Sequence, residues 1–172
     1  QREIGLSAGE PPTTRGYPPS VFAMLPKLLE RAGRNDKGSI TAFITVLVEG
    51  DDMNDIIGDT VRSIIDGHIV LSRKIAARGR YPSIDILESV SRVIKDVTTA
   101  EHRQANIGMR KLMATYKEAE DMINIGAYVK GANPDIDRAV ARHDDIEQFL
   151  IQGVDEKFEW DEVFSRLMEL SY

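Results

Sequence analysis

The spacing of apolar residues divides the chain into two parts at about residue 97. In the first part, residues 39–48 form a run that is rich in β-branched side chains and apolar on both faces, as in a strand covered on both sides. A helical pattern that Gly67 stops and a second apolar run, residues 68–71, follow it. Strand, helix and strand in this order predict a right-handed βαβ unit in a parallel sheet.

Turn-forming residues delimit the other elements expected before residue 97. Residues 9–19 hold four prolines and two glycines and are expected to form an ordered loop. Ser20 suits the N-cap of a helix that Gly33 ends, and residues 72–78 form a short helix closed by Gly79.

Residues 98–172 carry helical spacing throughout and predict a bundle of three helices. Thr98 and Glu101 form a capping box before the first helix, Asn133 caps the second, and Trp160 belongs to the third. The inward stripes of the first two helices are Ala105, Met109, Leu112, Met113, Tyr116, Ala119 and Ile123, and then Ile136, Val140, Ile146, Phe149 and Leu150. The predicted fold class is therefore α/β, with an α/β part over residues 1–97 and a helical domain over residues 98–172.

Composition narrows the class of protein. The 172 residues include no cysteine, which excludes thiol catalysis and cysteine-ligated zinc, and His68, His102 and His143 show no metal-ligand spacing. We therefore expect three structural histidines and no metal site. No apolar run approaches the roughly 20 residues that cross a bilayer, so a soluble, cytoplasmic protein is expected.

The net charge of −6 lies entirely in the second part of the chain. Residues 1–97 carry 13 basic and 13 acidic side chains, whereas residues 98–172 carry 9 and 15. A nucleic-acid surface needs a basic patch, so this distribution argues against nucleic acid. It allows either a basic protein partner on the acidic half or an ordinary solvated surface.

The segment Gly33–Ser39 has the glycine spacing of a phosphate loop, but Lys37 stands before the second glycine instead of after it. A phosphate loop must also open a helix, whereas this segment runs into the apolar run at residue 39. We therefore interpret it as a hairpin-like connection.

Tyr81 and Arg92 are the candidate site residues that the pattern itself singles out. Pro82 restricts the backbone at Tyr81, and Arg92, between Ser91 and Val93, could present its fork of donors to a phosphate or carboxylate. The ordinary alternatives, a turn packed on the core and a surface ion pair, stay open on this reasoning alone.

Six blocks in order, GEPPTTRGYPPSVF, KGSITAF, VEGDDMND, DGHIVLSR, RYPSID and SVSRV, resemble the flagellar and type III secretion export ATPases, relatives of the rotary ATP synthase catalytic subunits. NIGAYVKGANPDID favours the flagellar branch over the virulence branch. The resemblance implies that residues 1–97 are the C-terminal portion of a RecA-like P-loop ATPase domain. The family's amino-terminal barrel, phosphate loop, catalytic glutamate and magnesium-holding aspartate would then lie upstream of Gln1.

The resemblance also implies roles for single residues. Tyr81 matches the aromatic that stacks on adenine, Phe149 matches a second wall of that pocket, and Val154 stands where the rotary relatives have another aromatic. Arg92 matches the arginine finger, which acts on the nucleotide of the neighbouring subunit. Residues 49–55, the loop around Tyr17 and the turn over 126–137 match segments that face a central channel or stalk.

The leading hypothesis from the sequence is therefore the C-terminal part of a homohexameric ATPase that energises flagellar protein export at the membrane export gate. Its ligands would be ATP and Mg²⁺ in the full-length enzyme, with no cofactor and no activity expected for these 172 residues alone. Its partners would be further copies of itself, a coiled-coil stalk protein, export chaperones and substrates. The alternatives are a virulence-type secretion ATPase and an interaction module that binds a stalk or chaperone.

Overall fold

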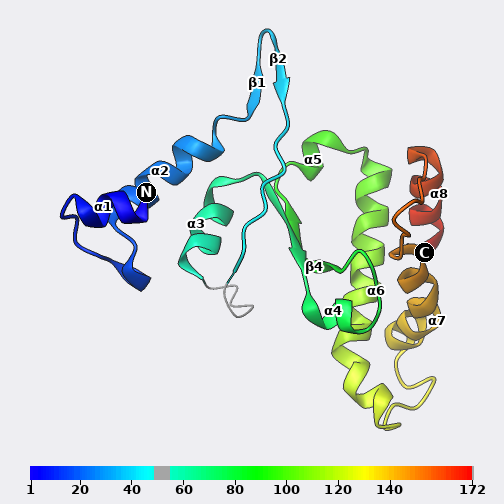
Figure 1. Ribbon diagram of the computed structural model, residues 1–172. Helices are drawn as coiled ribbons and strands as arrows, with labels where there is room; N and C mark the ends of the chain where they lie inside the picture. The colour runs from blue at the N-terminus through cyan, green and yellow to red at the C-terminus, as the bar shows by residue number, and fades with distance from the viewer. Residues whose placement is uncertain (49–54, 172) are drawn as a thin grey trace. The chain divides into compact units, whose positions relative to one another are not determined.

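A computed structural model describes residues 1–48 and 55–171 of the chain (Figure 1). These residues form two compact units, an N-terminal unit over residues 1–66 and a C-terminal unit over residues 67–172. The domain boundary that we expect after residue 97 stays a prediction. The candidate site residues Tyr81, Arg92, Phe149 and Val154 all belong to the C-terminal unit.

The N-terminal unit consists of short elements, and the proline-rich loop joins the first two α-helices. Its helices and strands are α1 (Arg2–Ser7), the 3₁₀ turn η1 (Thr14–Gly16), α2 (Pro19–Leu29), β1 (Gly33–Asn35), β2 (Gly38–Ile40) and α3 (Ile56–Ile64). Helix α2 begins one position before Ser20, so the predicted N-cap is wrong. The carboxylate of Glu10 accepts the Ser20 amide at 3.0 Å and replaces a side-chain cap.

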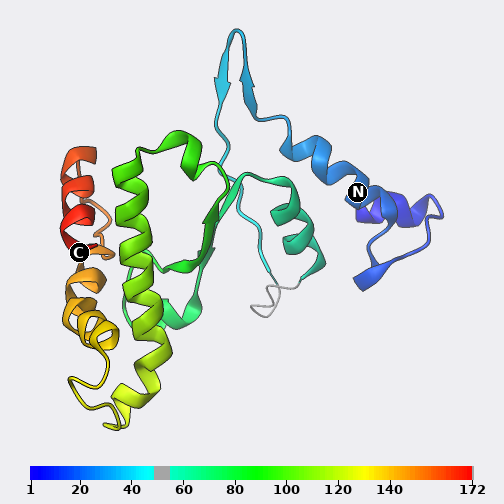
Figure 2. The ribbon, with the colours of Figure 1, turned by 180° about the vertical axis from the view of Figure 1, so that it is seen from behind.

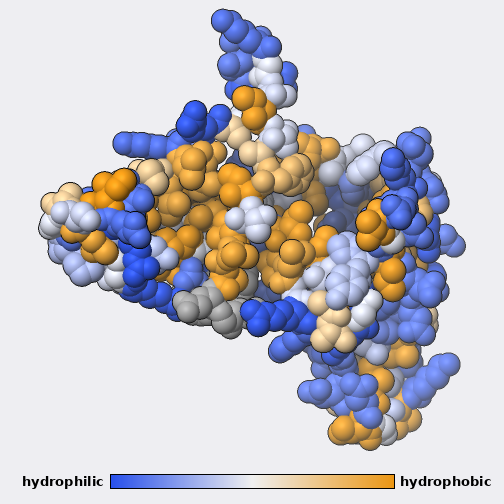
Figure 3. Space-filling model, viewed as in Figure 1, coloured by the Kyte–Doolittle hydropathy of each residue, from blue (hydrophilic) through white to orange (hydrophobic). Residues whose placement is uncertain are grey.

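The hairpin prediction for Gly33–Ser39 is confirmed. Strands β1 and β2 pair antiparallel, with Gly33 opposite Ile40. The Asn35 side chain accepts the amides of Lys37 and Gly38 at 2.9 and 3.0 Å, which closes the turn between them. The hairpin tip is hydrophilic, and apolar atoms gather where the chain leaves it (Figure 3).

The predicted strand over residues 39–48 is wrong beyond Ile40, and so is the parallel pairing. Residues 41–48 have no regular structure, and Phe43 and Leu47 are 91% and 89% exposed. Within the described residues the sheets are two antiparallel pairs, β1 with β2 and β3 with β4, so no βαβ unit forms there. The composition of 39–48 is that of a covered strand, but the described residues supply no neighbouring strand to pair its backbone groups.

The C-terminal unit packs a two-stranded ribbon and short helices against a layer of three long helices. Its elements are β3 (Gly67–Leu71), α4 (Arg73–Ala77), β4 (Ile84–Ser91), α5 (Ile94–Val97), α6 (Ala100–Asn124), α7 (Pro134–Phe149) and α8 (Trp160–Leu170). Helix α6 runs beside β4 on one side and beside α7 and α8 on the other in both views (Figures 1 and 2). The predicted strand 68–71 and short helix 72–78 are confirmed within one residue at each end.

The helical layer confirms the predicted bundle, with two local corrections. Thr99 rather than Thr98 caps α6, since its hydroxyl accepts the His102 amide at 3.2 Å. On α7, Val140 is 40% exposed and Ala139 is buried in its place, because Ala139 lies seven positions, or about two helical turns, before the buried Ile146 and so shares its face. The buried core of the layer is Ala105, Met109, Leu112, Ala139, Ile146, Leu167 and Leu170.

Candidate functional site

The loop that connects α4 to β4 presents the ring of Tyr81. Gly79 has a φ of +79°, the left-handed conformation that ends α4, and the bond between Tyr81 and Pro82 is cis. The Tyr81 side chain is 58% exposed, so its ring is not buried in the core. An exposed ring on a short, tethered loop can stack on a flat ligand.

Arg80 fixes this loop to the end of α7, and sequence reasoning missed it. Its side chain is 8% exposed and donates to the Glu147 carboxylate at 3.1 Å and to the Ile84 carbonyl at 3.0 Å. The Gln152 amide donates to the Tyr81 carbonyl at 2.9 Å. These bonds hold the Tyr81 loop beside the α7–α8 loop. No signal in the sequence distinguishes Arg80 from the other arginines around it, because its carboxylate partner, Glu147, lies 67 residues away.

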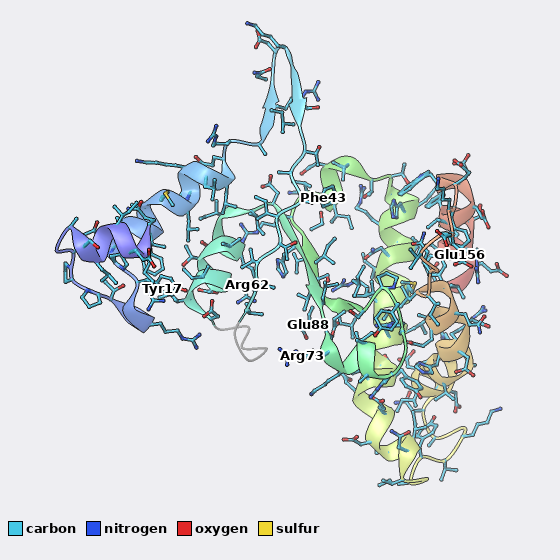
Figure 4. The ribbon with its side chains drawn as sticks, in the orientation of Figure 1. Tyr17, Phe43, Arg62, Arg73, Glu88 and Glu156 are labelled. Carbon is cyan, nitrogen blue, oxygen red and sulfur yellow. The ribbon has the colours of Figure 1, made fainter. Side chains whose placement is uncertain are left out.

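Phe149 and Val154 lie on the two sides of the attachment point at Gln152. Phe149 ends α7 and is half-buried against the helical core, with the Arg166 guanidinium 5.8 Å from its ring centroid. Val154 is fully exposed in the following loop, where the Glu156 carboxylate accepts the Gly153 amide at 2.7 Å (Figure 4). The structure therefore brings Tyr81 to the segment that carries Phe149 and Val154.

Arg92 lies at the other end of β4, directly after its last residue, and is exposed. The ribbon pairs Leu71 with Ile84 near Tyr81 and Gly67 with Ser91 near Arg92. The residues of β3 between these two pairs span roughly 13 Å at the usual rise of a strand. The structure therefore does not bring Arg92 and Tyr81 together within one chain.

The structure describes only part of the sequence in the three segments that are expected to face a channel or stalk. Residues 49–54 lie outside the described residues. Asp55 is buried, accepts the Ile57 and Gly58 amides at the start of α3, and binds Arg15 at 2.5 Å. In the proline-rich loop, Tyr17 contacts the Phe22 ring edge-on at 6.2 Å between centroids.

The turn between α6 and α7 is closed by side chains. The Tyr128 hydroxyl donates to Asp137 at 2.9 Å, and the other Asp137 carboxylate oxygen accepts the Gly131 amide at 2.8 Å. Desolvation and the hydrogen bond to Asp137 raise the pKa of Tyr128. Ile125 and Val129 in this turn are 77% and 70% exposed, so it presents apolar side chains on a closed backbone.

Two of the three histidines, His102 and His143, make ring contacts with aromatic side chains. His102 meets the rings of Trp160 and Phe164, each at 5.4 Å between centroids, and His143 stacks on Tyr116 at 3.6 Å. Across residues 1–48 and 55–171, no group of acidic or histidine side chains is placed to hold a metal ion. Over the same residues, every helix is too short or too polar to cross a membrane.

Two family models match the chain. Residues 1–91 match the nucleotide-binding domain of the ATP synthase alpha/beta family, and residues 98–169 match the C-terminal domain of the type III secretion ATPase EscN. The chain therefore belongs to the ATP synthase alpha/beta family, in its flagellar and type III secretion ATPase branch. Its fold class is α/β, with a nucleotide-binding portion followed by a helical portion.

Relatives of both export types match nearly the whole chain. The flagellum-specific ATP synthase of Bacillus subtilis (strain 168) is 54% identical over 99% of this chain and 39% of its own length. The type 3 secretion system ATPase of Pseudomonas savastanoi pv. phaseolicola is 50% identical over 99% of this chain and 38% of its own length. The chain thus spans about two fifths of the length of the curated relatives it matches.

Solved structures of one type III secretion ATPase share the fold. The assembled EscN of enteropathogenic E. coli is 47% identical, with a TM-score of 0.96 over 99% of this chain and 42% of that chain. EscN in complex with its central stalk EscO is 45% identical, with a TM-score of 0.88 over 99% of this chain and 40% of that chain.

Proposed function

We propose that this chain is the C-terminal part of an ATPase that hydrolyses ATP in a homohexameric ring to energise flagellar protein export. The observation that carries the proposal is the 54% identity to a flagellum-specific ATP synthase along 99% of the chain. The exposed Tyr81 and Arg92, at opposite ends of the β3–β4 ribbon, support it, because one chain would then contribute to two nucleotide sites.

In this proposal Tyr81, Phe149 and Val154 form the adenine side of one site. Tyr81 offers an exposed ring, Phe149 a half-buried one and Val154 an exposed aliphatic group, which suits a flat, apolar base. The groups that hold the phosphates and Mg²⁺ would come from the rest of the ATPase domain. When bound, ATP and Mg²⁺ supply the transferable phosphoryl group and its charge neutralisation.

Arg92 serves the site of the neighbouring subunit as an arginine finger. Its guanidinium would stabilise the charge that develops on the transferring phosphoryl group, which a planar fork of donors does better than an ammonium. Action across the subunit boundary explains why Arg92 lies away from Tyr81 in its own chain.

The partners follow from the same assignment. The EscN relative is solved with a central stalk, and the turn between α6 and α7, with its exposed Ile125 and Val129, is the surface that we assign to such a stalk. Export chaperones, export substrates and the membrane export gate complete the set, and the protein would work in the cytoplasm at the inner face of the membrane. Residues 98–172, with 9 basic and 15 acidic side chains, favour basic partner surfaces over nucleic acid.

Virulence-type secretion is the second candidate, because a type 3 secretion ATPase of Sinorhizobium fredii is also 54% identical. Complementation separates the two: a full-length protein carrying this chain should restore motility in a strain that lacks its flagellar ATPase. Restored virulence secretion without motility would favour the second candidate. A stalk-binding or chaperone-binding module without ATPase activity would restore neither.

Arg92→Ala in a full-length protein carrying this chain tests the catalytic assignment. We expect turnover to fall roughly 10³-fold or more with a much smaller change in ATP affinity, since arginine fingers act mainly on the transition state. Lysine at this position should rescue little. The matched control is Lys95→Ala, three residues further on, which should keep normal turnover. Near-normal turnover of Arg92→Ala would make Arg92 an ordinary surface arginine.

A further inference from the structure

Strand β4 contains a large bulge just before Arg92. His68 pairs with Val90 and Val70 with Asp85, so residues 86–89 of β4 face the single residue Ile69 of β3. Glu88, which is labelled in Figure 4, lies in this bulge. A bulge of this size disrupts the regular ladder over four residues, and their carbonyl groups are open to other donors.

Two side chains supply all four donors. Arg110 of α6 donates to the carbonyls of Ile86, of Leu87 at 3.0 Å and of Ser89 at 3.3 Å. The Nε2 atom of His68 lies 3.2 Å from the fourth carbonyl, that of Glu88. Three of the four bulge carbonyls therefore depend on one guanidinium, which comes from the helical layer.

The bulge is ordered from within as well. The Asp85 carboxylate accepts the Leu87 and Glu88 amides at 3.0 and 3.1 Å, and the Ser89 hydroxyl donates to the Asp85 carbonyl at 2.6 Å. The same hydroxyl accepts the Val70 amide of β3 at 2.9 Å. These hydrogen bonds fix the backbone conformation of the four bulge residues, and Arg110 connects their backbone to α6.

The strands come together again directly beyond the bulge. A side chain at Gly67 would meet the Val90 carbonyl at 2.9 Å, so the ribbon there is as close as a glycine permits. Ser91 pairs with Gly67, and Arg92 follows. The direction in which Arg92 leaves the ribbon is therefore set between the bulge and this close approach.

We propose that Arg110 is a positioning residue for Arg92: its three bonds to the bulge carbonyls hold the end of β4 so that the guanidinium of Arg92 meets the neighbour's nucleotide. This inference rests on the proposed function, since it needs Arg92 to act in catalysis. A displacement of about 1 Å at a reacting group can cost on the order of 10²-fold in rate. Arg110 would also transmit a movement of α6 to Arg92, because Arg110 donates to the Ser89 carbonyl and Arg92 lies only three positions after Ser89.

The test is a double-mutant cycle in a full-length protein carrying this chain, with Arg110→Met and Arg92→Ala alone and together. Arg110→Met keeps the apolar stem and removes the donors. We expect it to lower kcat about 10- to 100-fold with little change in KM for ATP. In the Arg92→Ala background the same substitution should change kcat less than about 3-fold, because the group that it positions is gone.

Two controls separate positioning from general stability. Lys111→Met removes a neighbouring charge on α6 whose ion pair is with Asp135, 3.6 Å away, and should leave kcat unchanged. Leu112→Ala destabilises the buried cluster, whose members come from α6, α7 and α8, and at an equal loss in melting temperature should lose less kcat than Arg110→Met. If Arg110→Met does not fold, Arg110→Lys, which keeps a charge and loses the fork, should give a smaller loss of kcat that also disappears without Arg92.

The outcomes distinguish this inference from the function on which it rests. If Arg92→Ala is inactive and Arg110→Met has a normal kcat, the positioning role alone is overturned. An equal loss of kcat with and without Arg92 would also overturn it, because Arg110 would then act on stability or elsewhere. A normal kcat of Arg92→Ala would overturn both the role of Arg92 as an arginine finger and the role of Arg110 in positioning it. Hydrogen exchange gives an independent readout: amides of residues 84–91 should exchange faster in Arg110→Met than in Lys111→Met.

Discussion

Tyr116 lies flat on His143, with 3.6 Å between ring centroids, at the edge of the helical core. Burial, together with the charges of Glu120 and Asp144, raises the pKa of Tyr116 above its ordinary value of 10.0. Between that value and the higher folded pKa, only the unfolded chain loses the phenolic proton. The free energy of unfolding therefore falls as pH rises through this window.

Replacing Tyr116 with phenylalanine should remove this pH dependence. Tyr116→Phe keeps a ring that can stack on His143 and removes the ionisable hydroxyl. We expect the variant to lose less stability than the parent between roughly pH 9 and pH 11. Urea unfolding at both pH values measures it. An equal loss in parent and variant would show that Tyr116 does not contribute.

At the scale of residues, the sequence identifies exposed candidate residues better than residues whose partners lie elsewhere in the fold. Tyr81 and Arg92 are singled out by their neighbours in the sequence, and both prove to be exposed. Arg80 and Arg110 look like any other arginine, because the Glu147 carboxylate that pairs with Arg80 is 67 residues away and the carbonyls that pair with Arg110 are 21 to 24 residues away. Only the fold places those partners within reach.

Among the elements, the ion pair between Arg80 and Glu147 joins the loop before β4 to the end of α7. Arg80→Met should loosen the Tyr81 loop against the segment that carries Phe149 and Val154. Since stacking of a base on an aromatic contributes about 1 to 3 kcal/mol, the preference in kcat/KM for ATP over CTP should fall several-fold. Steady-state kinetics of a full-length protein with the two nucleotides measures it.

The matched control for Arg80 is Arg78→Met. Arg78 also pairs with a glutamate of the helical layer, Glu120 at 2.9 Å, but its side chain is 72% exposed. Exposed pairs contribute little, so this variant should keep the base preference and nearly all of the stability. A base preference that is unchanged in Arg80→Met, or changed equally in both variants, would contradict the assignment.

Elements are predicted well where their signals are local. The hairpin at Gly33–Ser39, the helices of the C-terminal layer and the Asn133 cap all depend on residues close in sequence. The run 39–48 fails because a strand is defined by its neighbour, and apolar composition does not say which strand that is. The β4 bulge is missed for a related reason, since its donors come from His68 and Arg110.

On the scale of the whole molecule, the proposed function assigns an adenine side to one end of the β3–β4 ribbon and an arginine finger to the other. Such a division has a use only when copies of the protein meet, so that Arg92 of one copy completes the site of the next. The EscN relative, with a TM-score of 0.96, is solved in its assembled form. We therefore propose a ring in which each nucleotide site is built from two subunits.

Mixed rings test whether each nucleotide site is built from two subunits. Full-length subunits carrying Arg92→Ala are combined with subunits whose phosphate-loop lysine is replaced, and ring formation is verified by mass measurement. Each parent should be inactive, whereas mixed rings should recover part of the normal ATPase rate, because some interfaces join an intact Arg92 to an intact phosphate loop. Mixed rings as inactive as either parent would contradict action of Arg92 across the subunit boundary.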